Sequence, residues 1–243
     1  MKPNLLLFLL FFVLTACTQY QYLTVTGVDI AKIENTGFVS ENDTLKIQYA
    51  FSDYKGKVGI SIHNKLNQPI EIDWKKSAII LDGKAISLFS SNAVISATIE
   101  QDSMRRRNLF ANVTDPFYLA SLNGSIHISE PSNFIPPASY IYKVPIALPL
   151  EQFQNLPEQS AKTERASSLN NVQHTYKSFA FEKEGSPLRF KSYLTFRTGD
   201  GSAAKEFTAV HHFYISEVWK TEMGPEYFPQ YVLHNGDRFY LKP

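Results

Sequence analysis

The only thiol in the chain belongs to Cys17, and the residues before it follow a defined order of chemical types. Lys2 is the only charge before the cysteine, and ten apolar residues run from Leu5 to Leu14. Such a run is well short of the roughly 20 residues that span a bilayer as a helix. Thr15 and Ala16 are small, and the thiol that follows them is a potential nucleophile.

The segment Leu14-Thr15-Ala16-Cys17 resembles the lipobox of bacterial lipoproteins. The resemblance implies cleavage before Cys17, transfer of diacylglycerol to its thiol, and acylation, for example with palmitate. We therefore interpret residues 1–16 as a signal peptide, 17–22 as a lipidated tether and 23–243 as a β-rich domain. The alternatives are an ordinary secretory signal with a chance cysteine, or an N-terminal anchor helix.

The tether is short. Five residues separate Cys17 from Leu23, and they reach only about 17 Å at ~3.3–3.6 Å each. We expect the folded body to lie against the headgroups, with Tyr20 and Tyr22 at the interface. The tether has no acidic run, and residue 18 is Thr rather than Asp. Through the same resemblance, these features favour the periplasmic face of the outer membrane over the cell surface or the inner membrane.

His211-His212 is the pair that most suggests a metal site. Neighbouring residues on a strand point to opposite faces, so the two imidazoles are poorly placed to hold one ion. The other four histidines show no ligand spacing, and lipidation of Cys17 would leave no thiolate. We expect no metal and no cofactor.

Catalytic motifs are equally scarce. The sequence contains no Gly-x-Ser-x-Gly nucleophile elbow. A hydrolase that uses two carboxylates would leave no local motif, because the two acids can lie anywhere in the sequence. Exposed aromatic clusters can bind glycans or peptides, and the candidates lie near both ends of the chain: Tyr20, Tyr22, Tyr214, Trp219, Tyr227, Phe228 and Tyr231. We expect no catalytic residues, and a protein or glycan of the envelope as partner.

Composition limits the class of partner and the means of stabilisation. Removing residues 1–16 leaves 243 − 16 = 227 residues, with 24 − 1 = 23 basic and 23 acidic side chains. A formally neutral chain argues against a nucleic-acid partner. With one cysteine, which lipid would occupy, no disulfide can form, so the fold depends on its core. Hydrophobic residues make up 44% of the chain, which is enough for a sizeable core.

Strands must position whatever site exists. Leu45, Ile47, Tyr49 and Phe51 share one face of an alternating segment. Ile60 and Ile62 repeat the pattern, as do Ile72 and Trp74, and all eight residues are predicted to face the core. Asp82-Gly83 between apolar runs predicts a type I′ hairpin. In the last third, 207–218 is predicted as a long strand and 231–241 as a hairpin.

Two stretches break the regular pattern. Residues 90–135 contain Arg105-Arg106-Arg107 and a helix-compatible segment from Pro116 to Leu122, and they are interpreted as an insertion. Residues 158–171 are polar and lack a period, so they are predicted to form a mobile loop. The segment from Glu151 to Leu156 could form one helical turn, closed by Pro157.

From Thr44 to Leu148, the order of features resembles the immunoglobulin-like modules of uncharacterised Gram-negative lipoproteins. The features are the alternating strand, the loop from Asn64 to Ile70, the Asp82-Gly83 hairpin, and Ile135-Pro136-Pro137-Ala138-Ser139 before a closing strand. The expected fold is an all-β, antiparallel, immunoglobulin-like β-sandwich with a long insertion and a few short helical turns. The resemblance implies no activity. We expect a non-enzymatic binding, assembly or scaffolding module, or alternatively a hydrolase of envelope polymers.

Overall fold

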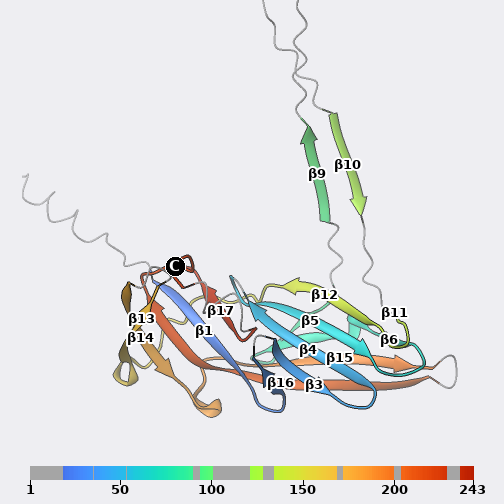
Figure 1. Ribbon diagram of the computed structural model, residues 1–243, viewed down its shortest axis with the longest axis horizontal. Coiled ribbons are helices and arrows are strands. Elements are labelled where there is room, and N and C mark those ends of the chain that lie inside the picture. The colour runs from blue at the N-terminus through green and yellow to red at the C-terminus, as the bar shows by residue number, and fades with distance from the viewer. Residues whose placement is uncertain are drawn as a thin grey trace, which may run out of the picture. The chain divides into compact units, whose positions relative to one another are not determined.

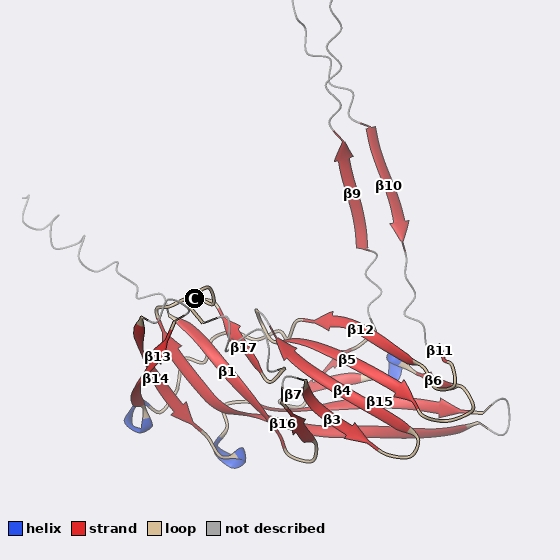
Figure 2. Cartoon of the chain, in the orientation of Figure 1, coloured by secondary structure: helices blue, strands red, loops and turns tan. Residues whose placement is uncertain are grey.

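The computed structural model describes residues 19–34, 36–52, 54–89, 94–100, 121–127, 134–168, 172–199, 204–228 and 236–243. Within these ranges the chain forms strands and three short 3-10 turns, and no α-helix (Figures 1 and 2). The strand pairings within sheets are antiparallel. The predicted all-β antiparallel sandwich, with short helical turns, is confirmed.

The larger sheet has ten strands. Its main path runs through β11 (Phe134–Ile135), β6 (Ile70–Ile72), β15 (Arg189–Thr198), β16 (Lys205–Thr221), β1 (Tyr20–Gly27) and β17 (Arg238–Leu241). β7 (Ala78–Leu81) pairs with β15 and with β8 (Lys84–Ser87). β14 (Gln173–Ala180) pairs with β16 and with β13 (Lys162–Ser167).

The smaller sheet has five strands, of which β2 to β5 form a meander and β12 adds at the edge, and it packs on the larger sheet. Its order is β12 (Tyr140–Ile146), β5 (Lys57–Asn64), β4 (Leu45–Ser52), β3 (Gly37–Glu41) and β2 (Ala31–Ile33). The alternation read from the sequence sets which face is buried, because successive side chains on a strand point to opposite faces.

The core lies between the two sheets, and the eight residues predicted to face it are all buried. Phe51 of the smaller sheet contacts Phe190 and Phe213 of the larger one, with ring centroids 5.5 and 5.3 Å apart. Trp74 reaches the same core from a 3-10 turn (Trp74–Lys76) rather than from a strand. The side chain of Asp73 caps that turn by accepting hydrogen bonds from the backbone N–H groups of Lys75 and Lys76.

One buried amide joins two segments that are far apart in sequence. Asn64, at the end of β5, is fully buried, and its Nδ2 donates to the carbonyl oxygens of Gln68 (2.8 Å), Ile135 (3.0 Å) and Pro136 (3.1 Å). Its Oδ1 accepts from the backbone N–H of Leu66 at 2.9 Å. The loop after β5 is thereby fastened to the Ile135-Pro136 segment.

The prediction of a mobile loop over residues 158–171 is corrected by the structure. Glu158–Ser160 forms a 3-10 turn, and Lys162–Ser167 forms β13, paired along its length with β14. The single helical turn expected before Pro157 is thus found after it. Only Ala166 of β13 is buried, so backbone pairing rather than an apolar face defines this strand. No alternation was therefore available to predict it.

The insertion forms a compact unit of its own, residues 90–131. Its described strands, β9 (Val94–Glu100) and β10 (Ser121–His127), pair antiparallel with each other. The arginine run and the helix-compatible segment from Pro116 lie outside the described residues, apart from Ser121 and Leu122 in β10.

Aromatic residues gather where β1 begins. Tyr22, Tyr176, Phe228 and Tyr240 are buried there in a cluster separate from the main core. Tyr22 was expected at a membrane interface, but it is only 6% exposed and its hydroxyl donates to the carbonyl of Met223 at 2.9 Å. That placement is therefore corrected, because Phe228 and Tyr240 pack against the Tyr22 ring. Tyr20 stays half-buried at the edge of the cluster.

Candidate ligand-binding site

A hollow in the described part of the chain lies at the start of β15. It has a volume of about 430 Å³, which falls within the range of about 300–1,000 Å³ typical of small-molecule sites. Val28 and Ile80 contribute apolar surface, and three cationic side chains contribute charge: Lys183, Arg189 and Lys191. We call this site the cationic hollow.

The strand register explains why these side chains meet. Arg189 and Lys191 are two residues apart on β15, so both point to the outer face of the larger sheet. Lys191 lies opposite Ile80 of β7 on one side and opposite His212 of β16 on the other. These three side chains form one cross-strand row on that face.

Two turns complete the wall of the cationic hollow. Asp82 and Gly83 have φ values of 46° and 81°, which confirms the predicted type I′ turn between β7 and β8. Lys183 arrives from a separate 3-10 turn (Lys183–Gly185) before β15. Elements that are distant in sequence therefore converge on one place.

The charge of the cationic hollow is unbalanced. Within the described ranges, Lys183, Arg189 and Lys191 form no ion pair with any carboxylate, and Asp82 is the only acidic residue of the lining. Lys183 and Arg189 are exposed, so water solvates them when no ligand is bound. An anion with a small apolar part matches this combination of charge and apolar surface.

His212, also in the lining, is held by Asp29. The carboxylate accepts from the His212 backbone N–H at 2.8 Å and lies 2.7 Å from its Nδ1. Partial burial acts to raise the pKa of Asp29, but these hydrogen bonds outweigh it and the pKa lies below its usual value. A neutral His212 would carry its proton on Nδ1 and keep Nε2 as an acceptor.

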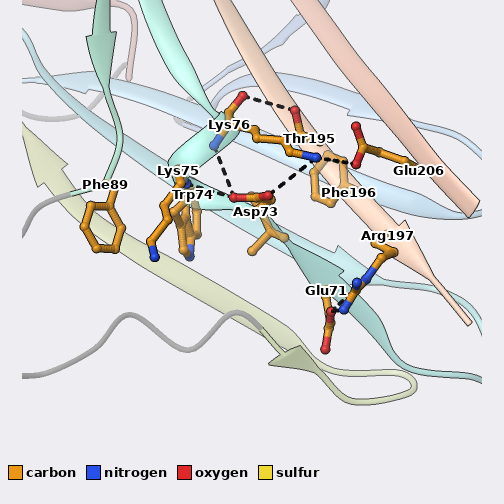
Figure 3. A pocket seen from close by; sticks show the side chains of 11 residues that line it. Glu71, Asp73, Trp74, Lys75, Lys76, Phe89, Thr195, Phe196, Arg197 and Glu206 are labelled. Carbon is orange, nitrogen blue, oxygen red and sulfur yellow. Dashed lines mark hydrogen bonds and ion pairs between the residues drawn. The ribbon is translucent and has the colours of Figure 1, made fainter. Parts of the chain in front are cut away.

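A second hollow, of about 260 Å³, lies beside β6 and the turn at Trp74 (Figure 3). Two of its three cations, Lys76 and Arg197, are paired with carboxylates, and Lys75 lies over the Phe89 ring. Lys76 Nζ lies 2.6 Å from Glu206 and 3.9 Å from Asp73, and Arg197 pairs with Glu71. Because its lining carries three acidic and three basic side chains, this hollow offers less attraction for a charged ligand than the cationic hollow does.

The two histidines lie on opposite faces of β16, as the alternation predicts. His211 is buried, and its Nδ1 lies 3.0 Å from the hydroxyl of Tyr49, which is also 3.1 Å from Ser192 Oγ. Burial lowers the pKa of His211. Ser192 is fully buried, so it is inaccessible to a substrate and this network serves the core. The described residues contain no group of three or more His, Cys, Asp or Glu side chains placed to hold a metal ion.

The sequence did not single out the cations of this site. Arg189 and Lys191 alternate with buried Leu188, Phe190 and Ser192, which is a signal for an outward-facing pair. It does not show that Lys183 and the Asp82 turn lie nearby. Cys17 and Tyr231 lie outside the described residues, and of the other aromatic candidates Phe228 is buried and Tyr227 is exposed.

Among the described residues, no helix is long and apolar enough to cross a bilayer. Comparisons with protein-family models, with curated proteins and with solved structures found no match to this chain.

Proposed function

We propose that this protein is a membrane-anchored envelope lipoprotein that binds an anionic glycan through the cationic hollow, without turning it over. The observation that carries the proposal is the set of Lys183, Arg189 and Lys191, which have no carboxylate partner in the described parts of the chain and surround apolar surface. Arginine and lysine recognise phosphate and carboxylate groups through charge-assisted hydrogen bonds.

The lining also argues for binding rather than hydrolysis. Among the residues that form the cationic hollow, none carries a hydroxyl or thiol that could act as a nucleophile. Asp82 is the only carboxylate among the lining residues, whereas the usual hydrolysis of a glycoside uses two carboxyl groups. Among the lining residues, His212 is the one general-base candidate, and its Nδ1 lies against Asp29.

Binding can be measured with the full-length lipoprotein in detergent micelles. The probes are a uronic-acid oligosaccharide, a phosphorylated oligosaccharide, a neutral oligosaccharide and an acidic peptide. We expect one of the charged sugars to bind, and the triple variant Lys183→Gln/Arg189→Gln/Lys191→Gln to weaken that binding at least tenfold. Each charge-assisted contact contributes about 1.5 kcal/mol, so the loss of all three would weaken binding by more than tenfold. Added salt should also weaken binding.

The matched control is Lys46→Gln/Lys65→Gln/Lys205→Gln, which removes the same charge outside the cationic hollow and should leave binding unchanged. Equal loss in both triple variants would show that only net charge matters. Preference for the acidic peptide would replace the glycan with a protein partner. Cleavage of a bound sugar, lost in His212→Gln, would support the hydrolase alternative.

The anchor is a separate part of this proposal. The lipobox-like segment before Cys17 and the resemblance to immunoglobulin-like envelope lipoproteins support it. Cys17→Ser should lose the lipid and leave the membrane fraction, since each buried methylene of an acyl chain contributes about 0.8 kcal/mol. Membrane association of the variant after a salt wash would contradict a purely lipid anchor.

We further propose that the body faces the periplasm from the outer membrane, on the basis of Thr18 and the non-acidic tether. Protease added to intact cells should leave it uncut until the outer membrane is permeabilised. Digestion without permeabilisation would place the body on the cell surface instead.

A further inference from the structure

We propose that the end of the body where β1 begins rests on the anionic phosphate headgroups of a bilayer, through Tyr20, Tyr54, Lys55 and Lys242. The inference rests on the proposed lipid anchor at Cys17. It adds a definite orientation and a second, non-covalent contact with the membrane.

Chain length brings this end to the bilayer. Tyr20 begins β1 only three residues after Cys17, a reach of about 10 Å. Tyr20 is fixed in the larger sheet by pairing with Thr221, and Gln21 lies opposite Leu241. In Figure 1 the C-terminus lies beside the first residues of β1, so Lys242 belongs to the same end.

Tyrosine rings form the apolar part of this surface. The Tyr240 ring lies 6.4 Å from that of Tyr20 and 5.9 Å from that of Tyr54. Tyr240 is buried, whereas Tyr20 and Tyr54 are half-buried at the edge of the cluster. A ring with an apolar body and a polar hydroxyl suits the headgroup region of a bilayer.

Two lysines supply the charge. The Nζ atoms of Lys55 and Lys242 lie 5.5 and 5.0 Å from the centre of the same Tyr54 ring. Neither lysine forms an ion pair with a described carboxylate. The described acids of this region include Glu222, which directly follows β16, and Glu226, which acts electrostatically on Tyr22. Two ammonium groups gathered on one aromatic ring form a local positive surface that lipid phosphates complement.

The turn that carries this surface is held in place. The backbone N–H of Lys55 donates to the carbonyl of Tyr240 at 2.9 Å, and the Lys55 carbonyl accepts from Leu148 at 2.9 Å. Lys55 has a positive φ of 60°, followed by Gly56 with a φ of 56°. The pair Tyr54-Lys55 is therefore presented by fixed backbone, while the long lysine side chains can still reach outward.

The orientation can be measured with the lipidated full-length protein in vesicles of phosphatidylethanolamine and phosphatidylglycerol. Because lipid occupies Cys17, a fluorophore can be attached to one added cysteine, either Pro243→Cys or Lys205→Cys. Position 205 begins β16, on the order of 50 Å along that strand from Thr221. A quencher attached to lipid headgroups should quench the label at 243 and leave the label at 205 bright.

The charge contribution has its own test. Each lysine near an anionic surface contributes about fivefold to association. Lys55→Gln/Lys242→Gln should therefore lower, about 25-fold, the ratio of molecules whose β1 end contacts the bilayer to molecules in which that end is detached. Quenching of the label at 243 measures this ratio. The control Lys84→Gln/Lys205→Gln removes the same charge elsewhere and should leave that ratio unchanged.

The outcomes separate the two proposals. If the protein fails to float with the vesicles, the lipid anchor is wrong. If it floats but the labels at 243 and 205 are quenched equally, the body lies flat or tumbles. The proposed contact between the β1 end and the headgroups is then refuted. Equal effects of the two double variants would refute the role of Lys55 and Lys242.

Discussion

The amide of Asn64 should be among the most sensitive single groups in the smaller sheet. Its two Nδ2 protons serve three carbonyl oxygens and its Oδ1 serves one N–H, so removing the side chain costs about three hydrogen bonds. At ~1 kcal/mol each, Asn64→Ala should lower the free energy of unfolding by about 3 kcal/mol. The carbonyl of Ile135 contributes most, because its hydrogen bond to Asn64 is buried.

Asn64→Asp tests the cause of that loss. Aspartate matches asparagine in shape, so it leaves no cavity, but at neutral pH it would place a carboxylate against three carbonyl oxygens. We expect Asp to be worse than Ala at pH 7, although Asp conserves more volume. Urea denaturation followed by tryptophan fluorescence gives both values.

A matched control is Asn42→Ala. Asn42 is exposed, and its Oδ1 accepts from the N–H groups of Thr44 and Leu45 at 2.8 Å. Water can replace these bonds, so the loss should be at most about 1 kcal/mol. If Asn64→Asp matches the wild-type protein, or is milder than Asn64→Ala, the hydrogen-bonding account is wrong.

Three further changes follow from other buried groups, all measured by urea denaturation. Trp74→Ala should cost about 3–5 kcal/mol because the ring is buried; a loss below 1 kcal/mol would contradict its place in the core. Burial lowers the pKa of His211, so the unfolded chain binds its proton first as pH falls below about 6.5. Stability should decline by at most about 1.4 kcal/mol per pH unit there, and His211→Gln should reduce that slope. Lys32→Met leaves the buried carboxylate of Asp237 without its cation and should cost about 2 kcal/mol, partly restored by adding Asp237→Asn.

Side-chain alternation in the sequence predicted the sandwich because burial follows it closely in β4 and β5. Leu45, Ile47 and Tyr49 could be assigned to the core without any tertiary information. Turn chemistry was equally local, since Asp82-Gly83 needs only its own backbone to define the hairpin. β13 was missed because both of its faces are largely exposed and its pairing with β14 leaves no side-chain pattern.

The cationic hollow could not be predicted for a different reason. Lys183 and Arg189 are close in sequence, but Val28 and His212 reach the site through the order of strands in the larger sheet. That order depends on pairings between distant segments, and such pairings cannot be read from a single sequence. The loop from Asn64 and the Ile135-Pro136 segment were both among the features that carried the family resemblance. The structure joins these two segments by direct hydrogen bonds.

The position of β1 constrains how the protein can fold. β1 pairs with β16 and β17, so its two partners are the last strands of the described chain to be synthesised. Until roughly 200 further residues exist, Leu23 and Val25 have no sheet to enter. Contacts of such long range make folding slow and leave an apolar strand available for wrong pairing. The nascent chain should therefore depend on a holding chaperone, and completion of the larger sheet should be the late, rate-limiting event.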